Sequence, residues 1–212
     1  SRLETLIHEL KEKGFTDHQE LAKAYDLLGV IYWESDNYDL AMNYFVDSLA
    51  IKEKLSNQEQ ILEMAYTINR IGRIYFHKRR YDICERWLLK ALNIYEGYYG
   101  EDHPTTAEVY LNLGSLNVIT YHFDKALSFY QKYLDINTKA YGEIHPTVSH
   151  IYYGFAWMST IKGEIDEAIK FAMKGMEIER KIYGKYSFIN GRFYFLCGLS
   201  NFKRSKYVEA LK

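Results

Sequence analysis

The residues of this chain that could carry out chemistry are its seven histidines, its two cysteines and its many acidic side chains. A zinc protease needs two histidines four residues apart on a helix, and His8-Glu9 has no second histidine at that spacing. Cys84 and Cys197 lack the CxxC spacing of redox and zinc sites. The glycines stand singly, which rules out a phosphate-cradling loop, and no serine or aspartate has a plausible base beside it. The sequence therefore predicts no enzyme, no metal site and no cofactor.

Side chains suited to recognition are more informative. Tyr66, Asn69 and Arg73 are spaced by three and four residues, so a helix would place them on one surface. An amide can hydrogen-bond a peptide backbone through both of its groups, and a guanidinium can hold a carboxylate bidentately. Trp33 and Phe76 lie where the same surface turns toward a neighbouring helix pair, so each is expected to touch either a ligand or the core. The predicted peptide-binding residues are Tyr66, Asn69, Arg73, His77, Asn112, Tyr153, Trp157 and Arg192.

The elements that must position these residues repeat along the chain. One small residue recurs at intervals of 43, 42, 42 and 42 residues, as Gly29, Gly72, Gly114, Ala156 and Gly198. A second small residue follows each of them twelve positions later, as Ala41, Cys84, Ala126, Ala168 and Ala210. A fixed period with a fixed internal offset indicates an array of one repeated unit. Apolar residues spaced by three and four predict two amphipathic helices per unit, with the glycine facing the small residue.

This pattern resembles the tetratricopeptide repeat over nearly the whole chain. The first unit shows it best, in Tyr25, Leu28, Gly29, Tyr32, Ala41 and Phe45. The usual unit has about 34 residues, and the additional residues here follow the second helix. Those segments, residues 100–105 and 142–147, are similar to the 42-residue repeats of kinesin light chains. HEAT and armadillo units share this length, but the constant offset of twelve favours the tetratricopeptide repeat.

The resemblance implies an all-α fold, a right-handed superhelical solenoid of antiparallel helix pairs whose first helices line a concave groove. We predict a single array over residues 1–212, with residues 1–14 as the second helix of a truncated repeat. Full repeats are expected at 19–57, 60–100, 103–142 and 145–184, and an incomplete one at 187–212. Eleven helices are expected, the last two at 187–203 and 206–212. Neither end offers the polar helix that closes a solenoid, so we expect a fragment of a longer protein.

Composition narrows the environment and the partner. A net charge of −1 gives no field that would attract nucleic acid or anionic lipid. No apolar run approaches the length of a membrane span, and the N-terminus shows no secretory pattern. Cys84 and Cys197 lie in different repeats, which favours a reducing compartment over a disulfide. We therefore predict a cytoplasmic protein with neither nucleic acid nor membrane as its partner.

Two functions agree with this sequence. The first is a non-catalytic protein-interaction module or scaffold that binds a peptide, a helix or a partner domain in the concave groove. That partner could be another domain of the same full-length chain. The alternative is a regulatory sensor domain of a larger signalling protein or effector, switched by a peptide or protein ligand. It follows from a resemblance to the peptide-pheromone receptors of Gram-positive bacteria.

Overall fold

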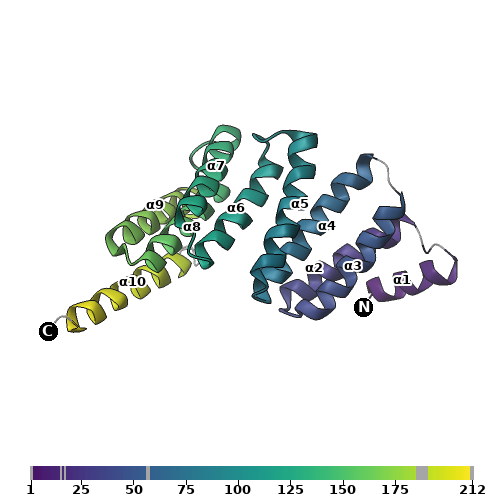
Figure 1. Ribbon diagram of the computed structural model, residues 1–212, viewed down its shortest axis with the longest axis horizontal. Coiled ribbons are helices and arrows are strands. Elements are labelled where there is room, and N and C mark those ends of the chain that lie inside the picture. Colours follow the sequence, from purple (N-terminus) through teal and green to yellow (C-terminus); the bar gives the residue numbers. More distant parts are fainter. Residues whose placement is uncertain (1, 15, 17, 56–57, 185–190, 211–212) are drawn as a thin grey trace. The chain divides into compact units, whose positions relative to one another are not determined.

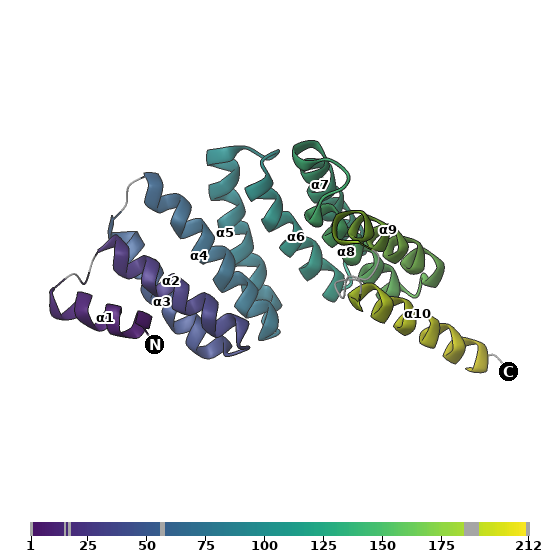
Figure 2. The same cartoon turned by 180° about the vertical axis from the view of Figure 1, so that it is seen from behind.

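The computed structural model describes residues 2–14, 16, 18–55, 58–184 and 191–210, and it is all-α within these ranges (Figure 1). The helices divide into two compact units, Ser1–Glu101 and Asp102–Lys212. Consecutive helices pack as pairs, α2 with α3, α4 with α5, α6 with α7 and α8 with α9. The same pairs can be followed from behind in Figure 2. The predicted all-α fold of helix pairs is confirmed.

Unit 1 contains the first five helices, and α3 also packs against α4. They are α1 (Arg2–Glu12), α2 (Gln19–Glu34), α3 (Tyr38–Leu55), α4 (Gln58–His77) and α5 (Tyr81–Tyr99). A Cβ added at Gly29 would lie 2.7 Å from the ring of Phe45, and one at Gly72 would lie 3.0 Å from Leu88. The glycines therefore allow a close approach, as predicted. They are covered, however, by a large side chain sixteen residues later and not by the small residue that was expected to face them.

Unit 2 contains the other five helices of the described ranges. They are α6 (Pro104–Ile119), α7 (Phe123–Tyr141), α8 (Pro146–Lys162), α9 (Ile165–Tyr183) and α10 (Gly191–Ala210). Gly114 is covered by the ring of Tyr130, again sixteen residues later. Ala126, one helical turn before Tyr130, is fully buried. The small residue lets the two backbones approach, and the large ring then fills the space above the glycine.

The segments between repeats start and stop helices through identifiable residues. The side chains of His103 and His145 accept hydrogen bonds from the backbone N–H groups of Thr105 and Thr147, at 3.1 and 3.3 Å. Each histidine is an N-cap, and the proline after it occupies the first helical turn, where a missing N–H costs nothing. Gly142 ends α7 with φ 82° and ψ 171°, a region open essentially only to glycine. This is not the common left-handed cap, but it requires glycine equally.

The last predicted helix boundary is wrong. We expected a break between residues 203 and 206, whereas α10 is continuous from Gly191 to Ala210. The turns of earlier repeats place Asp36, Arg79 and Tyr121 at positive φ, which costs free energy in residues other than glycine. Packing of the following helix offsets that cost. Ser205 holds the equivalent position, and within the described residues no second helix of its own repeat packs on α10. Residues 187–190 and 211–212 of the prediction lie outside the described ranges.

Candidate functional site

The predicted binding residues fall into two groups, one in each unit, and all of them lie on first helices of the repeats. Unit 1 holds four of them on α4: Tyr66, Asn69, Arg73 and His77. Unit 2 holds the other four on α6, α8 and α10: Asn112, Tyr153, Trp157 and Arg192. The structure therefore gives two candidate surfaces, and each is described by itself.

The surface of unit 1 is a groove of about 390 Å³ between α2 and α4. Its apolar walls are Leu27, Val30 and Tyr66, and the side chains of Leu27 and Tyr66 are 54% and 37% exposed. The remaining lining is charged: Lys23, Asp26, Lys52 and Glu63. Exposed apolar side chains beside charged groups give a ligand both contact area and orientation.

A buried ion network forms the floor of this groove. Lys52, on α3, is fully buried and is ion-paired with Asp26 of α2. Its ammonium also donates to the hydroxyl of Thr67 at 2.8 Å and to the backbone carbonyl of Glu63 at 3.2 Å. The Thr67 hydroxyl lies 3.0 Å from Asp26 Oδ1 and 3.1 Å from the same carbonyl, so it can donate to either. Three acceptors surround the three N–H groups of Lys52, and the network ties both helices of the first repeat to the next repeat.

An aromatic cluster lies at the C-terminal ends of α2 and α4. The guanidinium of Arg73 lies 4.6 Å from the ring of Trp33, and His77 meets that indole edge-on at 5.0 Å. Tyr38 stacks on His77 at 4.7 Å. Burial lowers the pKa of His77, and the nearby Arg73 cation lowers it further, against the opposing effect of Asp36. Trp33 thus contacts the neighbouring repeat, the second of the two roles expected for it, and Arg73 contributes to packing as well as to the surface.

The surface of unit 2 is organised around a buried carboxylate. Glu179, on α9, is almost fully buried and is ion-paired with Arg192 of α10. The hydroxyl of Ser149, on α8, donates to the same carboxylate oxygen at 2.9 Å. Glu179 Oε2 accepts no hydrogen bond from the described residues. Glu179 and Arg192 line a groove of about 420 Å³, whose other lining residues are Glu108, Tyr133, Pro146, Thr147, His150 and Tyr183.

Arg192 also joins the predicted aromatic residues of unit 2. Its guanidinium lies 5.5 Å from the ring of Tyr153 and 5.0 Å from that of Phe193. Trp157 is half-buried against the core cluster of α8, α9 and α10. Asn112 is half-buried on α6. The structure thus brings Tyr153 and Arg192 into contact, and Trp157 packs against the same cluster as Tyr153.

Models of the family described as "Tetratricopeptide repeat" match residues 22–55 and 63–139. The chain carries tetratricopeptide repeats. The helix pairs are the structural form of this match, and the pair of α8 and α9 extends the same pattern beyond residue 139, with Ala156 in place of the glycine. A search of curated proteins finds no match.

Solved structures of other repeat proteins share the fold. A crystal structure of BtubC (BKLC) from P. vanneervenii superimposes with a TM-score of 0.72 at 16% identity, covering 99% of this chain and 89% of that one. A putative kinesin light chain with TPR-like repeats from Podosopora anserina gives 0.68 at 14% identity, covering 92% of each chain. The Rap conjugation gene regulator of plasmid pLS20, solved with the Phr* peptide, gives 0.66 at 20% identity. That match covers 85% of this chain and 47% of the regulator.

Sequence reasoning missed Lys52 and Glu179, because it assigned the binding face to the first helices of the tetratricopeptide repeats alone. Both residues lie on second helices, 23 positions after Gly29 and Ala156. The equivalent residues in the other two full repeats are Tyr95 and Asn137, which are also buried. A polar or charged residue at the same position of every repeat was the available signal.

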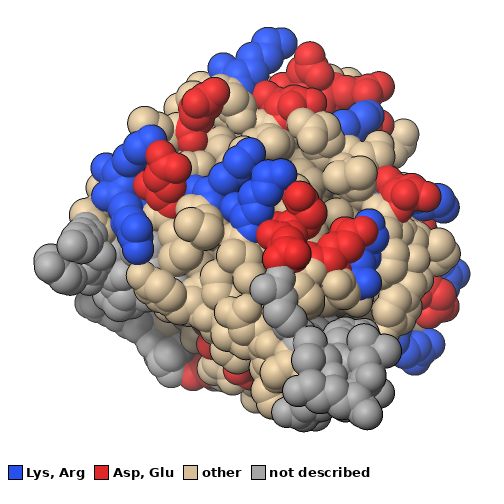
Figure 3. Space-filling model, turned by 90° about the vertical axis from the view of Figure 1, so that its left-hand side faces the viewer, with Lys and Arg blue, Asp and Glu red and all other residues tan. Residues whose placement is uncertain are grey.

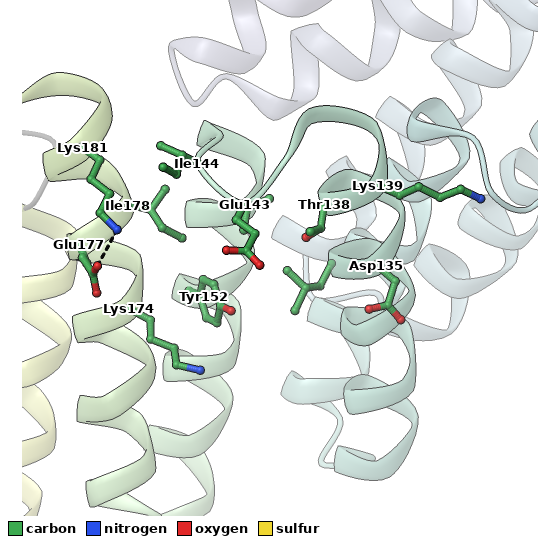
Figure 4. Close-up of a pocket in the computed structure, with 12 residues that line it drawn as sticks. Asp135, Thr138, Lys139, Glu143, Ile144, Tyr152, Lys174, Glu177, Ile178 and Lys181 are labelled. Carbon is green, nitrogen blue, oxygen red and sulfur yellow. Dashed lines mark ion pairs between the residues drawn. The ribbon is translucent and has the colours of Figure 1, made fainter.

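A third hollow lies on the second helices, where no binding residue was predicted. It has a volume of about 680 Å³ and lies between α7 and α9, beside the loop after Gly142. Figure 4 shows Glu143, Tyr152 and Lys174 in the space between these helices, and Glu177 paired with Lys181 on the α9 side. Lys174 lies 5.6 Å from the Tyr152 ring. Cations and anions alternate along this hollow, so its charge favours neither sign of ligand.

The charged surface shows no large area of one sign on the face drawn in Figure 3, where acidic and basic side chains are interspersed. Within the described ranges, none of the helices is both long enough and apolar enough to cross a membrane.

Proposed function

We propose that this chain is a non-catalytic protein-interaction module that binds an extended peptide or partner segment in the α2–α4 groove of unit 1. The groove with exposed Leu27 and Tyr66 on first helices is the observation that carries the proposal. Tetratricopeptide repeats are in general interaction modules, which supports it. The likeness in fold to a Rap regulator solved with a peptide supports a peptide as the ligand.

The chemistry of the groove defines how such a ligand is held. Leu27, Val30 and Tyr66 supply contact area, and Tyr66 is an aromatic of the kind that is enriched in binding hot spots. The ion network beneath them is already paired, so the ligand does not have to separate Lys52 from Asp26. Asn69 and Arg73 continue the surface along α4 and supply polar contacts to the ligand backbone or to a carboxylate.

The proposal is tested by selecting peptides from a random phage-displayed library on the full chain and then measuring their affinity by calorimetry. Leu27→Ser should weaken a selected peptide by about tenfold or more, as expected for loss of a hot-spot contact. Leu89→Ser is the matched control, since Leu89 is a similarly exposed leucine (46%) on the second helix α5. The control should bind the peptide with unchanged affinity.

Asn69 and Arg73 are tested together with the same selected peptide. Replacing both by alanine should weaken binding by about 2–4 kcal/mol, as for loss of hot-spot residues. Because Arg73 lies on Trp33, the variant is first checked for an intact fold by its helical circular dichroism. Full affinity in this variant and in Leu27→Ser would reject the α2–α4 groove. The affinity of the selected peptide for Lys174→Glu would then test the hollow between α7 and α9.

A second candidate function is the sensor domain of a regulator that is switched by its peptide. The fold shared with Rap regulators is the observation in its favour. A sensor must change its conformational equilibrium when the ligand binds, because a ligand with equal affinity for two states shifts neither. Small-angle scattering with and without a selected peptide tests this. An unchanged scattering profile at saturating peptide would reject the sensor function and leave the interaction module as the remaining function.

A further inference from the structure

The buried ion pair of unit 2 is joined at a single oxygen. Arg192 donates from one terminal nitrogen to Glu179 Oε1, and the Ser149 hydroxyl donates to the same oxygen. Glu179 Oε2 accepts no hydrogen bond from the described residues, and Arg192 Nε has no acceptor among them. An arginine and a carboxylate often pair through two parallel hydrogen bonds, so this pair uses only part of its capacity.

An incomplete set of partners is not a general property of this repeat position. Lys52 holds the equivalent position in unit 1 and has an acceptor for each of its three N–H groups. A buried carboxylate oxygen without a donor is costly, and each such atom in a folded protein requires an explanation. Glu179 lines the groove of unit 2, so a ligand in that groove can supply the donor.

The groove that Glu179 and Arg192 line has an excess of acidic groups. Glu108 of α6 is exposed and lines it as well, so two carboxylates stand against one guanidinium when His150 is neutral. Burial raises the pKa of the Tyr133 hydroxyl, and the Glu108 carboxylate raises it further. Tyr133 therefore remains neutral, and its oxygen can accept a hydrogen bond. This balance favours a cation as the ligand.

The groove also has an aromatic wall. Tyr183 lines it with a side chain that is 46% exposed. The face of a tyrosine ring attracts an ammonium or a guanidinium, and the apolar stem of a lysine or arginine packs on such a surface. A volume of about 420 Å³ lies near the lower end of the range for small-ligand sites, about 300–1,000 Å³. It therefore suits a single side chain.

We propose that this groove of unit 2 binds one basic side chain, lysine or arginine, of a partner protein. The cation lies between the carboxylates of Glu179 and Glu108, and its stem packs on Tyr183. A carboxylate has about four acceptor positions, so Arg192 and the ligand share Glu179. Arg192 keeps a third of its side chain in solvent and is held through one nitrogen, so it can turn and expose Oε2 to the ligand. The site shares no residue with the α2–α4 groove and does not depend on that groove binding a peptide.

The probes are four acetylated and amidated tripeptides with glycine on each side of arginine, citrulline, lysine or norleucine. Citrulline has the shape of arginine without its charge, and norleucine has the stem of lysine without its ammonium. Each peptide is titrated into the ¹⁵N-labelled full chain at about pH 7.5, where an ordinary histidine is neutral. The NMR signals of the Ser149, Glu179 and Arg192 amides report binding. The arginine and lysine peptides should bind about tenfold or more tightly than their neutral analogues.

Matched variants place the cation in the groove. Glu179→Gln and Glu108→Gln each remove one negative charge at nearly constant shape, and each should weaken the arginine peptide by about fivefold or more. Neither should change the affinity of the citrulline peptide. Glu177→Gln is the control, since it makes the same charge change on the exposed side of α9 and should bind the arginine peptide normally. Because Glu108 is exposed, its variant tests the site even where Glu179→Gln disturbs unit 2.

Four results would overturn the proposal. The first is the absence of saturable shifts with the arginine and lysine peptides, and the second is equal affinity for arginine and citrulline. The third is an unchanged affinity in both Glu179→Gln and Glu108→Gln. The fourth is tighter binding of a glutamate tripeptide at the same amides, which would make Arg192 the binding group and an anion the ligand. Spermidine is titrated in parallel, and tighter binding of this free polyamine than of the peptides would exclude a protein side chain as the ligand.

Discussion

Lys52 in unit 1 and Glu179 in unit 2 occupy the same repeat position with opposite charges. Both are buried, both lie on a second helix, and both pair with groups on adjacent first helices. Lys52 meets Asp26 and Thr67, whereas Glu179 meets Ser149 and Arg192. The comparison teaches that a buried ion at this position can link successive repeats with either sign of charge.

The two links differ in how completely they are satisfied. The ammonium of Lys52 has an acceptor for each of its three N–H groups. The carboxylate of Glu179 uses only one oxygen, and its partner Arg192 keeps a third of its side chain in solvent. A buried ion that is fully hydrogen-bonded is costly to disturb, so unit 1 should depend on its link more strongly than unit 2.

The largest expected effect is that of Lys52→Met. It leaves the carboxylate of Asp26, whose side chain is 14% exposed, without its cation. Removing one partner of a buried pair typically costs about 3–5 kcal/mol of unfolding free energy. Urea unfolding of the variant and of the unmodified chain measures the change. Adding Asp26→Leu to Lys52→Met should recover part of the loss, and a double variant no more stable than the single one would contradict this explanation.

Arg192→Met should have the next largest effect, about 2–3 kcal/mol, because Glu179 stays buried with only Ser149 as a donor. Hydrogen exchange measured by mass spectrometry should show faster exchange in α8, α9 and α10 than in the unmodified chain. Exchange in unit 1 serves as the internal reference. A loss of unfolding free energy larger than that of Lys52→Met would show that unit 2 depends on its link more strongly than unit 1.

Glu179→Gln should cost less, about 1 kcal/mol, since the amide can still accept from Ser149 and Arg192 retains water around its exposed third. The same urea experiment tests it, with Glu177→Gln on the exposed side of α9 as the control. The control breaks only the surface pair with Lys181 and should unfold as the unmodified chain does. Equal losses of unfolding free energy in the two variants would show that the burial of Glu179 does not contribute to stability.

The smallest expected effect is a pH dependence confined to unit 1. The pKa of His77 is lowered from its ordinary value of 6.5 by burial and by Arg73. The unfolded chain therefore takes up this proton more readily, and the unfolding free energy falls as the pH drops through and below 6.5. Unfolding at pH 7.5 and 5.5 should differ less in His77→Gln than in the unmodified chain. An unchanged difference would assign the pH dependence to other groups.

Helix positions could be predicted closely from sequence because single residues determine them. His103 and Pro104 start α6, and Gly142 ends α7 through backbone angles that other residues avoid. The continuity of α10 could not be predicted, because the turns at Arg79 and Tyr121 use residues with no strong turn preference. Such turns depend on the packing of the following helix, which is a property of the folded chain.

The site was predictable only where spacing defines a surface. Tyr66 and Arg73 share one face of α4, as their spacing requires. The burial of Lys52 could not be predicted from the lysine alone, because a lysine on an amphipathic helix is normally solvent-exposed. Its acceptors lie up to 26 residues away along the chain, on Asp26 and Thr67, and only the folded structure brings them together.

The opposite charges of Lys52 and Glu179 also restrict how such a chain can evolve by duplication and recombination. A repeat that ends in a buried lysine must be followed by one that brings acceptors, as Glu63 and Thr67 do. A repeat that ends in a buried glutamate must be followed by one that brings a cation, as Arg192 does. Exchanging the first and fourth repeats would therefore leave Glu179 without its cation at one junction, and it would place Arg192 beside Lys52, which keeps Asp26 of its own repeat, at the other. Repeats with the same helix pattern are therefore not freely interchangeable, because a buried charge restricts which repeat can follow.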